Sequence, residues 1–181
     1  GWGVSGLLAD RQGVWMPISG EGGHVGLPIH DPIQQQIWSA LHARDGRVSA
    51  ESVLSGQGLV NIHDCLLFER TGHWPSESLS PAHITTLALK QNEPLARQVI
   101  EIFCRWLGAL AGDLALTLGA SGGVFIGGGI APRLVDELQT FGFRRSFEDK
   151  GKLAAYLQPV PVWVIDAPVS PALQGVSTLL D

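Results

Sequence analysis

The sequence predicts an α/β protein in which helices pack on a mixed sheet whose first strands are antiparallel. Two short apolar runs open the chain, and later apolar runs alternate with segments of helical periodicity. The chain has 181 residues, of which 45% are hydrophobic, so it can bury a core of its own. No internal repeat, low-complexity tract or linker divides it. We therefore expect a single domain over residues 1–181.

The first two strands are expected to form a hairpin. Residues 4–9 and 14–19 are apolar runs separated by Asp-Arg-Gln-Gly, a turn-rich linker of the length that hairpins use. Residues 25–27 could return as a third antiparallel strand before Pro28 interrupts it. The polar residues 20–24 would then lie in a loop between strands.

Helix signals follow the strands. Asp31 as N-cap and Pro32 at the first helical position predict a helix that runs to about residue 43. Ser49 is a second N-cap candidate, and a further helical stretch covers residues 59–69.

The longest helix is predicted over residues 92–118. A loop over residues 71–79 and a helix that begins at Ser80 and Pro81 precede it. The second half of the long helix is apolar on nearly every side, which indicates burial in the centre of the domain.

The last third of the chain alternates strands and helices. Residues 122–129 read as a strand bracketed by glycines that feeds a helix from Pro132. A polar stretch follows over residues 147–152, residues 160–165 read as a buried strand, and a short helix ends the chain.

Composition limits the kind of partner. The formal net charge is -5 and only 16% of the residues are charged, which argues against nucleic acid as a ligand. No apolar run has the length of a membrane span, and the first residues do not resemble a signal peptide. Cys65 and Cys104 are far apart in apolar, helix-like stretches, as buried thiols would be. We expect a protein of the reducing cytoplasm that binds small ligands.

The loop at residues 20–24 (Gly-Glu-Gly-Gly-His) is the first candidate site. Its glycines let the backbone approach a ligand, and Glu21 and His24 can converge on it. A desolvated sugar needs such groups, because a carboxylate accepts two hydrogen bonds and an imidazole donates or accepts one. A tight turn whose Glu21 and His24 face water is the alternative that the spacing leaves open.

Two further segments could carry chemistry. Residues 49–56 place Glu51 in the first turn of a helix, where the helix dipole favours glutamate whatever its function. Residues 122–129 (Gly-Gly-Val-Phe-Ile-Gly-Gly-Gly) leave backbone bare at the strand ends, where a nucleotide could lie.

Rival motifs fit less well. The glycine run has no G-x-G-x-x-G order and no later acidic strand end, as a dinucleotide fold would require. Residues 150–152 (Lys-Gly-Lys) are not a Walker loop. None of the six histidines forms a His-x-x-x-His pair, so we expect no metal site.

Taken in order, four segments resemble bacterial glucokinases of the hexokinase and actin-like ATPase superfamily. They are residues 20–24, 49–59, 122–133 and 147–151. Four matched segments in one order are more specific than any one alone. The resemblance covers essentially the whole chain but about the C-terminal half or more of the family's length.

The resemblance implies a fold and a reaction. The fold is an actin-like ATPase (ribonuclease H-like) lobe, one of two lobes with ATP and sugar in the cleft between them. The reaction is the glycolytic transfer of a phosphoryl group from ATP to glucose, giving glucose 6-phosphate and ADP, with magnesium on the nucleotide. The residues implied to contact glucose are Glu21, His24 and Glu51. The family works as a cytoplasmic homodimer.

The resemblance also implies a nucleotide site. Four glycines would border the adenosine pocket: Gly122, Gly123, Gly127 and Gly128. Relatives carry a second phosphate loop, Gly-Thr-Gly-Leu-Gly, of which this chain keeps Gly1-Trp2-Gly3. Gly1 and Gly3 are therefore expected to lie at the nucleotide as well.

The departures from the family concern catalysis. The catalytic aspartate, its neighbouring asparagine and the first phosphate loop belong to the N-terminal lobe, which this chain lacks, so we expect these 181 residues alone to be inactive. One alternative is another sugar kinase of the related repressor and kinase family, although its cysteine-rich zinc motif is missing here. Another is a noncatalytic sugar-sensing domain that keeps Glu21, His24 and Glu51.

Overall fold

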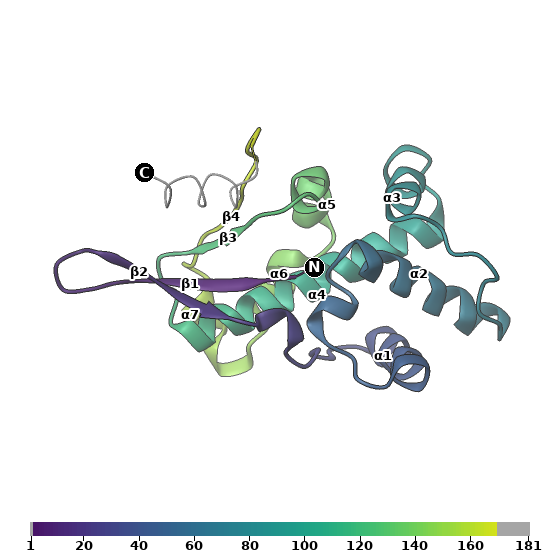
Figure 1. The fold of residues 1–181 in the computed structure, drawn as a ribbon, viewed down its shortest axis with the longest axis horizontal. Helices are drawn as coiled ribbons and strands as arrows, with labels where there is room; N and C mark the ends of the chain where they lie inside the picture. The colour runs from purple at the N-terminus through teal and green to yellow at the C-terminus, as the bar shows by residue number, and fades with distance from the viewer. Residues whose placement is uncertain (1, 170–181) are drawn as a thin grey trace.

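The computed structural model describes residues 2–169 as a helical body with two small sheets. A hairpin of β1 (Val4–Ala9) and β2 (Trp15–Gly20) opens the chain, and β3 (Val124–Ile126) and β4 (Val162–Val164) form a parallel pair. Figure 1 shows the long helix α4 (Pro94–Leu118) running through the body, with α2 and α3 at one end and the hairpin at the other. The predicted α/β class is confirmed.

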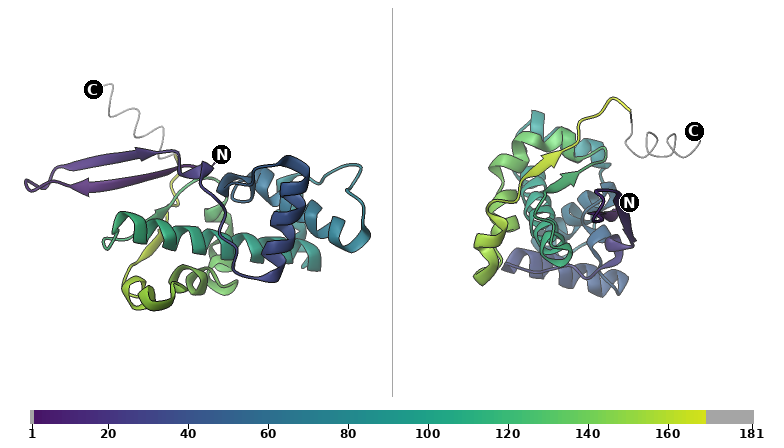
Figure 2. Two further views of the ribbon diagram at one scale, coloured as in Figure 1. Left: turned by 90° about the horizontal axis from the view of Figure 1, so that it is seen from below. Right: turned by 90° about the vertical axis from the view of Figure 1, so that its left-hand side faces the viewer.

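The hairpin forms as the sequence predicts. Its register runs from Val4 opposite Gly20 to Ala9 opposite Trp15. One carboxylate oxygen of Asp10 accepts hydrogen bonds from the backbone N–H groups of Gln12 and Val14, each at 2.8 Å, which closes the turn. The tip of this turn lies beyond the helices in Figure 1 and in the left-hand view of Figure 2.

The predicted third strand at residues 25–27 is wrong. After β2 the chain turns through a short 3-10 helix, η1 (Gly22–His24), and then makes one isolated antiparallel bridge, from Gly26 to Ser49. Because η1 redirects the chain away from the hairpin and Pro28 follows, residues 25–27 cannot add to the β1–β2 edge.

The first helices begin at side-chain caps. Asp31 accepts from the N–H of Gln34 at 2.9 Å and starts α1 (Pro32–Asp45), as predicted. Ser55 accepts from the N–H of Gly58 at 2.9 Å and starts α2 (Gly56–Thr71) three residues before the predicted residue 59. The Ser55 hydroxyl is the signal that the sequence reading overlooked.

The later helices α3 and α4 also begin at side-chain caps. Ser80 accepts from the N–H of His83 at 3.2 Å and starts α3 (Pro81–Lys90). Glu93, and not Asn92, caps α4, because both of its carboxylate oxygens accept from the first turn, whereas Asn92 has a φ of 52°. The predicted burial of α4 is confirmed for residues 106–112, which are all buried, whereas Leu118 at its end is 39% exposed.

The chain between β3 and β4 crosses over through helices. They are η3 (Ala131–Leu134), α5 (Val135–Thr140), α6 (Phe143–Glu148), η4 (Gly151–Leu153) and α7 (Ala154–Leu157). The polar stretch at residues 147–152 is therefore the end of α6 and the start of η4. The final helix that the sequence predicts lies outside the described residues.

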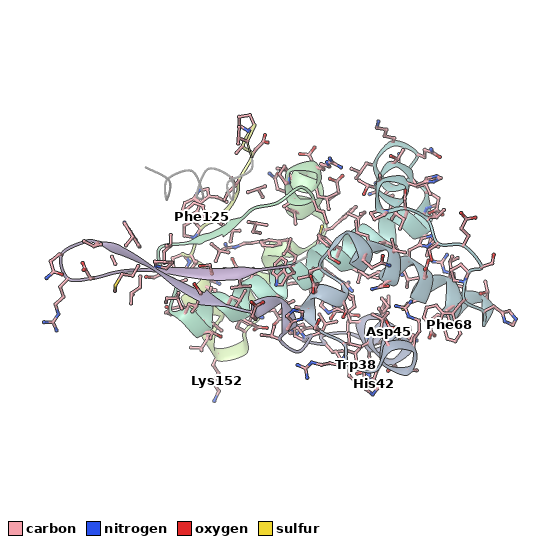
Figure 3. The ribbon with its side chains drawn as sticks, in the orientation of Figure 1. Trp38, His42, Asp45, Phe68, Phe125 and Lys152 are labelled. Carbon is pink, nitrogen blue, oxygen red and sulfur yellow. The ribbon has the colours of Figure 1, made fainter. Side chains whose placement is uncertain are left out.

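The strands of residues 2–169 form two separate pairs and not one continuous sheet. Large apolar side chains are exposed on both: Leu7 (67%) and Trp15 (66%) on the hairpin, and Phe125 (64%), which stacks on Trp163, on the parallel pair. Figure 3 shows Phe125 on the same side of the body as β4. In the described part of the chain, no helix combines the length and hydrophobicity needed to cross a bilayer.

Both cysteines are buried as free thiols, and we expect them to be unreactive in the folded protein. Burial raises the pKa of Cys65 and of Cys104 to about 12, so the reactive thiolate is scarce at pH 8. Labelling with a thiol-specific disulfide reagent at pH 8 should be at least about 100-fold slower in the native protein than in guanidinium. Fast labelling of the native protein would contradict this burial.

Candidate functional site

A backbone bridge brings two of the three predicted sugar-binding residues together. His24 ends η1, and Glu51 lies in a second short helix, η2 (Ala50–Ser52). The N–H of Ala50 donates to the carbonyl of Val25 at 3.0 Å, beside the Gly26–Ser49 bridge. As a result the Nε2 atom of His24 lies 3.9 Å from the Oε2 atom of Glu51, although the residues are far apart in sequence.

The Glu51 carboxylate is held by a second contact. Its Oε1 atom accepts a hydrogen bond from the backbone N–H of Trp2 at 3.2 Å. Trp2 also lies against the His24 loop, since a Cβ atom added at Gly23 would be only 2.1 Å from the Trp2 carbonyl oxygen. Gly23 is thus needed for the approach of the chain start to η1. The side chains of His24 and Glu51 remain 66% and 36% exposed, so a solute can reach them.

Glu21 is the residue just before η1, and it is not among the residues that line the cavity beside His24 and Glu51. Its carbonyl accepts from the N–H of His24 at 3.0 Å, and its side chain is exposed. The turn of η1 therefore places Glu21 and His24 on one short loop that packs against η2. The sequence predicted a loop here, and the structure makes it helical.

A cavity of about 600 Å³ opens beside His24 and Glu51. Most of its lining residues have polar side chains; they are His24, Ser49, Glu51, Ser52, Ser55, Gly56, Gln57 and Asn61. Hydroxyl, amide, imidazole and carboxylate groups together can donate and accept many hydrogen bonds, as a neutral polyhydroxylated ligand requires.

Of the residues that line this cavity, the sequence predicts His24 and Glu51 as sugar-binding residues. Ser49 was assigned as a helix cap, and the N–H of Ser49 does donate to the hydroxyl of Ser52 at 3.1 Å. Gln57 and Asn61 were missed. They lie four residues apart on the first turns of α2, with Glu51 just upstream, and that spacing is the signal that could have found them.

The predicted nucleotide-binding glycines lie apart from one another. Gly1 is outside the described residues, and Gly3 is exposed just before β1. Gly122 and Gly123 precede β3, whereas Gly127 and Gly128 follow it. Four residues of extended chain from Gly123 to Gly127 span about 13 Å. The two pairs of glycines are therefore at opposite ends of the strand.

The two ends of β3 also differ in their surroundings. A Cβ atom at Gly123 would be 2.2 Å from the ring of Trp163, so the packing of β4 already requires glycine there. Nothing lies within 4 Å of the position that a Cβ atom would take at Gly128, whose φ is 104°. Within residues 2–169, no group of three His, Cys, Asp or Glu side chains is placed to hold a metal ion.

Comparison with known proteins gives one consistent match. The glucokinase family model matches residues 1–181. The glucokinase of Campylobacter jejuni subsp. doylei is 44% identical over 181 residues, which cover all of this chain and 54% of that protein. The glucokinase of Neisseria meningitidis serogroup B is 42% identical with the same coverage. The chain thus spans about half the length of the curated relatives it matches.

Solved structures agree with this match. A glucokinase from an Antarctic psychrotroph superposes with a TM-score of 0.82 at 34% identity, over 91% of this chain and 51% of that chain. A glucokinase from Balamuthia mandrillaris in complex with glucose superposes with a TM-score of 0.74 at 20% identity, over 92% of this chain and 48% of that chain. At that lower identity the likeness concerns the fold.

Proposed function

This chain belongs to the glucokinase family, and we propose that residues 1–181 are the C-terminal lobe, which binds sugar and nucleotide, of an ATP-dependent glucokinase. The complete enzyme would transfer the terminal phosphoryl group of ATP to the 6-hydroxyl of glucose. The observation that carries the proposal is the meeting of Glu51 and His24, at 3.9 Å, beside a cavity lined mostly by residues with polar side chains.

The sugar would be bound by charge-assisted hydrogen bonds. Glu51 and Glu21 offer carboxylate oxygens as acceptors for sugar hydroxyls, and His24 offers a ring nitrogen. A hydrogen bond to a charged group is worth about 1.5–3 kcal/mol, so a few of them supply both affinity and orientation. Orientation matters because phosphoryl transfer depends mainly on positioning and charge neutralisation.

For the nucleotide we favour the carboxyl end of β3. Ligands of parallel α/β sheets bind beyond the carboxyl ends of the strands, where Gly127 and Gly128 are both exposed. The family resemblance implies that Gly1 and Gly3 lie at the phosphates, and Gly3 follows Trp2, whose N–H donates to Glu51. Gly122 and Gly123 fit this pocket less well, because they lie at the other end of β3. Magnesium would arrive on the phosphates of ATP and neutralise their charge.

Family membership supports a wider set of proposals. We expect the lobe to have the actin-like ATPase fold, with both strand pairs in one mixed sheet of the complete protein. One continuous core of buried residues reaches from Leu27 to Val160, which supports treating residues 1–181 as one lobe. A homodimer that works in the cytoplasm is the expected assembly.

The purified 181-residue chain is expected to show no glucose-dependent ATP turnover. The catalytic aspartate of the family is expected in the other lobe, and without a base to accept the hydroxyl proton the transfer is slow. A coupled assay of ADP release, with the complete enzyme as positive control, checks this. Turnover by the 181-residue chain would contradict the assignment of catalysis to the other lobe. Glucose binding without any turnover by the complete protein would favour a noncatalytic sugar sensor.

A further inference from the structure

The backbone that carries Glu51 is held by side chains of α2. The hydroxyl of Ser55 donates to the carbonyl of Glu51 at 3.0 Å. The side-chain amide of Asn61 donates from Nδ2 to the carbonyl of Ser52 at 2.8 Å. Because η2 has only three residues, these two bonds constrain most of its peptide groups.

The orientation of the Asn61 amide is set by its partners. Its Oδ1 atom accepts from Nη2 of Arg44 at 3.0 Å, and an arginine can only donate. The Nδ2 atom must therefore face Ser52, whose carbonyl can only accept. Asn61 is 8% exposed, so an unmatched partner there would be costly.

Arg44 is itself held in place. It donates to both carboxylate oxygens of Asp45, from Nε at 2.7 Å and from Nη2 at 2.6 Å, and its guanidinium lies 4.9 Å from the ring centre of Trp74. Figure 3 shows Asp45 at the end of α1, beside α2. A chain of contacts thus runs from the end of α1 through Asn61 to the residue after Glu51.

We infer that Asn61 is a positioning residue for sugar binding: by holding the Ser52 carbonyl it fixes η2 and so keeps the Glu51 carboxylate beside His24. The inference rests on the proposed function. Asn61 needs no contact with the sugar in this role. Without its amide donor, η2 keeps the Ser55 bond to the Glu51 carbonyl but loses the bond to Ser52, so Glu51 meets the sugar in a less fixed geometry.

The test is Asn61→Asp in the complete enzyme. This isosteric change keeps an acceptor for Arg44 but turns the donor that faces Ser52 into a second acceptor. The dissociation constant of glucose should rise about tenfold, whereas that of ADP stays within about twofold, both measured by calorimetry. A purely structural role would lower Tm without separating the two ligands.

The matched control is Gln34→Glu. Gln34 is another buried amide, 1% exposed, whose Oε1 accepts from the N–H of His30 at 2.9 Å, away from η2. The same amide-to-acid change there should lower Tm and leave glucose affinity within about twofold of wild type. If Asn61→Asp does not fold, the substitute variant is Arg44→Gln, which removes the guanidinium that donates to Asn61. It should raise the dissociation constant of glucose about threefold.

Three outcomes would overturn the inference. For a folded Asn61→Asp enzyme, they are an unchanged affinity for glucose and an equal loss of affinity for glucose and ADP. If only Arg44→Gln folds, the third is an unchanged glucose affinity in that variant. A wild-type enzyme that does not bind glucose would instead refute the proposed function, and the inference with it.

Discussion

Replacing Glu51 by glutamine in the complete enzyme is expected to weaken glucose binding about 10- to 100-fold. The amide has nearly the shape of the carboxylate, but it loses the charge and turns one acceptor into a donor. In the wild type, Oε1 of Glu51 accepts from the Trp2 N–H, and Oε2 lies toward His24. In the variant, the NH₂ group takes one of these two positions, so either the Trp2 N–H or a sugar hydroxyl loses its acceptor. ADP affinity should change less than glucose affinity.

The matched control is Glu69→Gln, the same chemical change at an exposed residue in the last turn of α2. It should leave the dissociation constant of glucose within about twofold of wild type. Calorimetric titration of both variants with glucose decides the matter. If Glu51→Gln binds glucose as well as wild type does, the assignment of Glu51 to the sugar site fails.

Replacing Gly108 by alanine is expected to cost about 3 kcal/mol of folding free energy. Gly108 and Gly112 lie one helical turn apart on α4, where α6 crosses it. A Cβ atom at Gly108 would be 2.2 Å from the carbonyl oxygen of Phe143, and one at Gly112 would be 2.3 Å from that of Phe147. These carbonyl oxygens are backbone atoms of a packed helix, so the clash with an added Cβ atom is relieved only if α4 and α6 move apart. Trp106 and Phe147, both fully buried, would then have to repack.

The measurement is thermal unfolding of the wild-type and variant proteins. For a domain of this size, 3 kcal/mol corresponds to a Tm lower by about 6–12 °C. Gly56→Ala serves as control, because its Cβ atom would be no closer than 3.6 Å to any neighbour and alanine favours the helix. Equal Tm values for Gly108→Ala and Gly56→Ala would show that the α4–α6 contact adapts without cost.

The helices were the most predictable part of the fold. The structure has helices that begin at the predicted N-caps Asp31 and Ser80. It also has the predicted glycine-bracketed strand before Pro132. Each of these predictions depends on only a few neighbouring residues. The start of α2 was missed by three residues because Gly56 and Gly58 have low helix propensity, whereas the hydroxyl of Ser55 caps the helix before them. The strand at residues 25–27 was predicted from its apolar residues alone, and η1 directs those residues elsewhere.

The candidate site was less predictable than the elements that carry it. Glu21, His24 and Glu51 were identified by residue type and by resemblance, but a glutamate in a first helical turn is explained equally well by the helix dipole. Asn61 shares a helix face with Gln57, and this spacing could have marked it as a lining residue, but its positioning role carried no signal. Its role depends on a carbonyl nine residues away and on an arginine of another helix, and neither pairing leaves a pattern in the sequence.

Local sequence is enough to set the caps and the hairpin turn, because each depends on neighbours within about one helical turn. The apolar pattern of α4 likewise predicts which helix is buried. The family was also readable from the order of four short segments. The distance between His24 and Glu51 was not, since it follows from the single bridge between Gly26 and Ser49. Such a contact forms only when α1 has folded back and α2 has packed against η2, so it depends on the free energy of the whole core and not on the residues beside it.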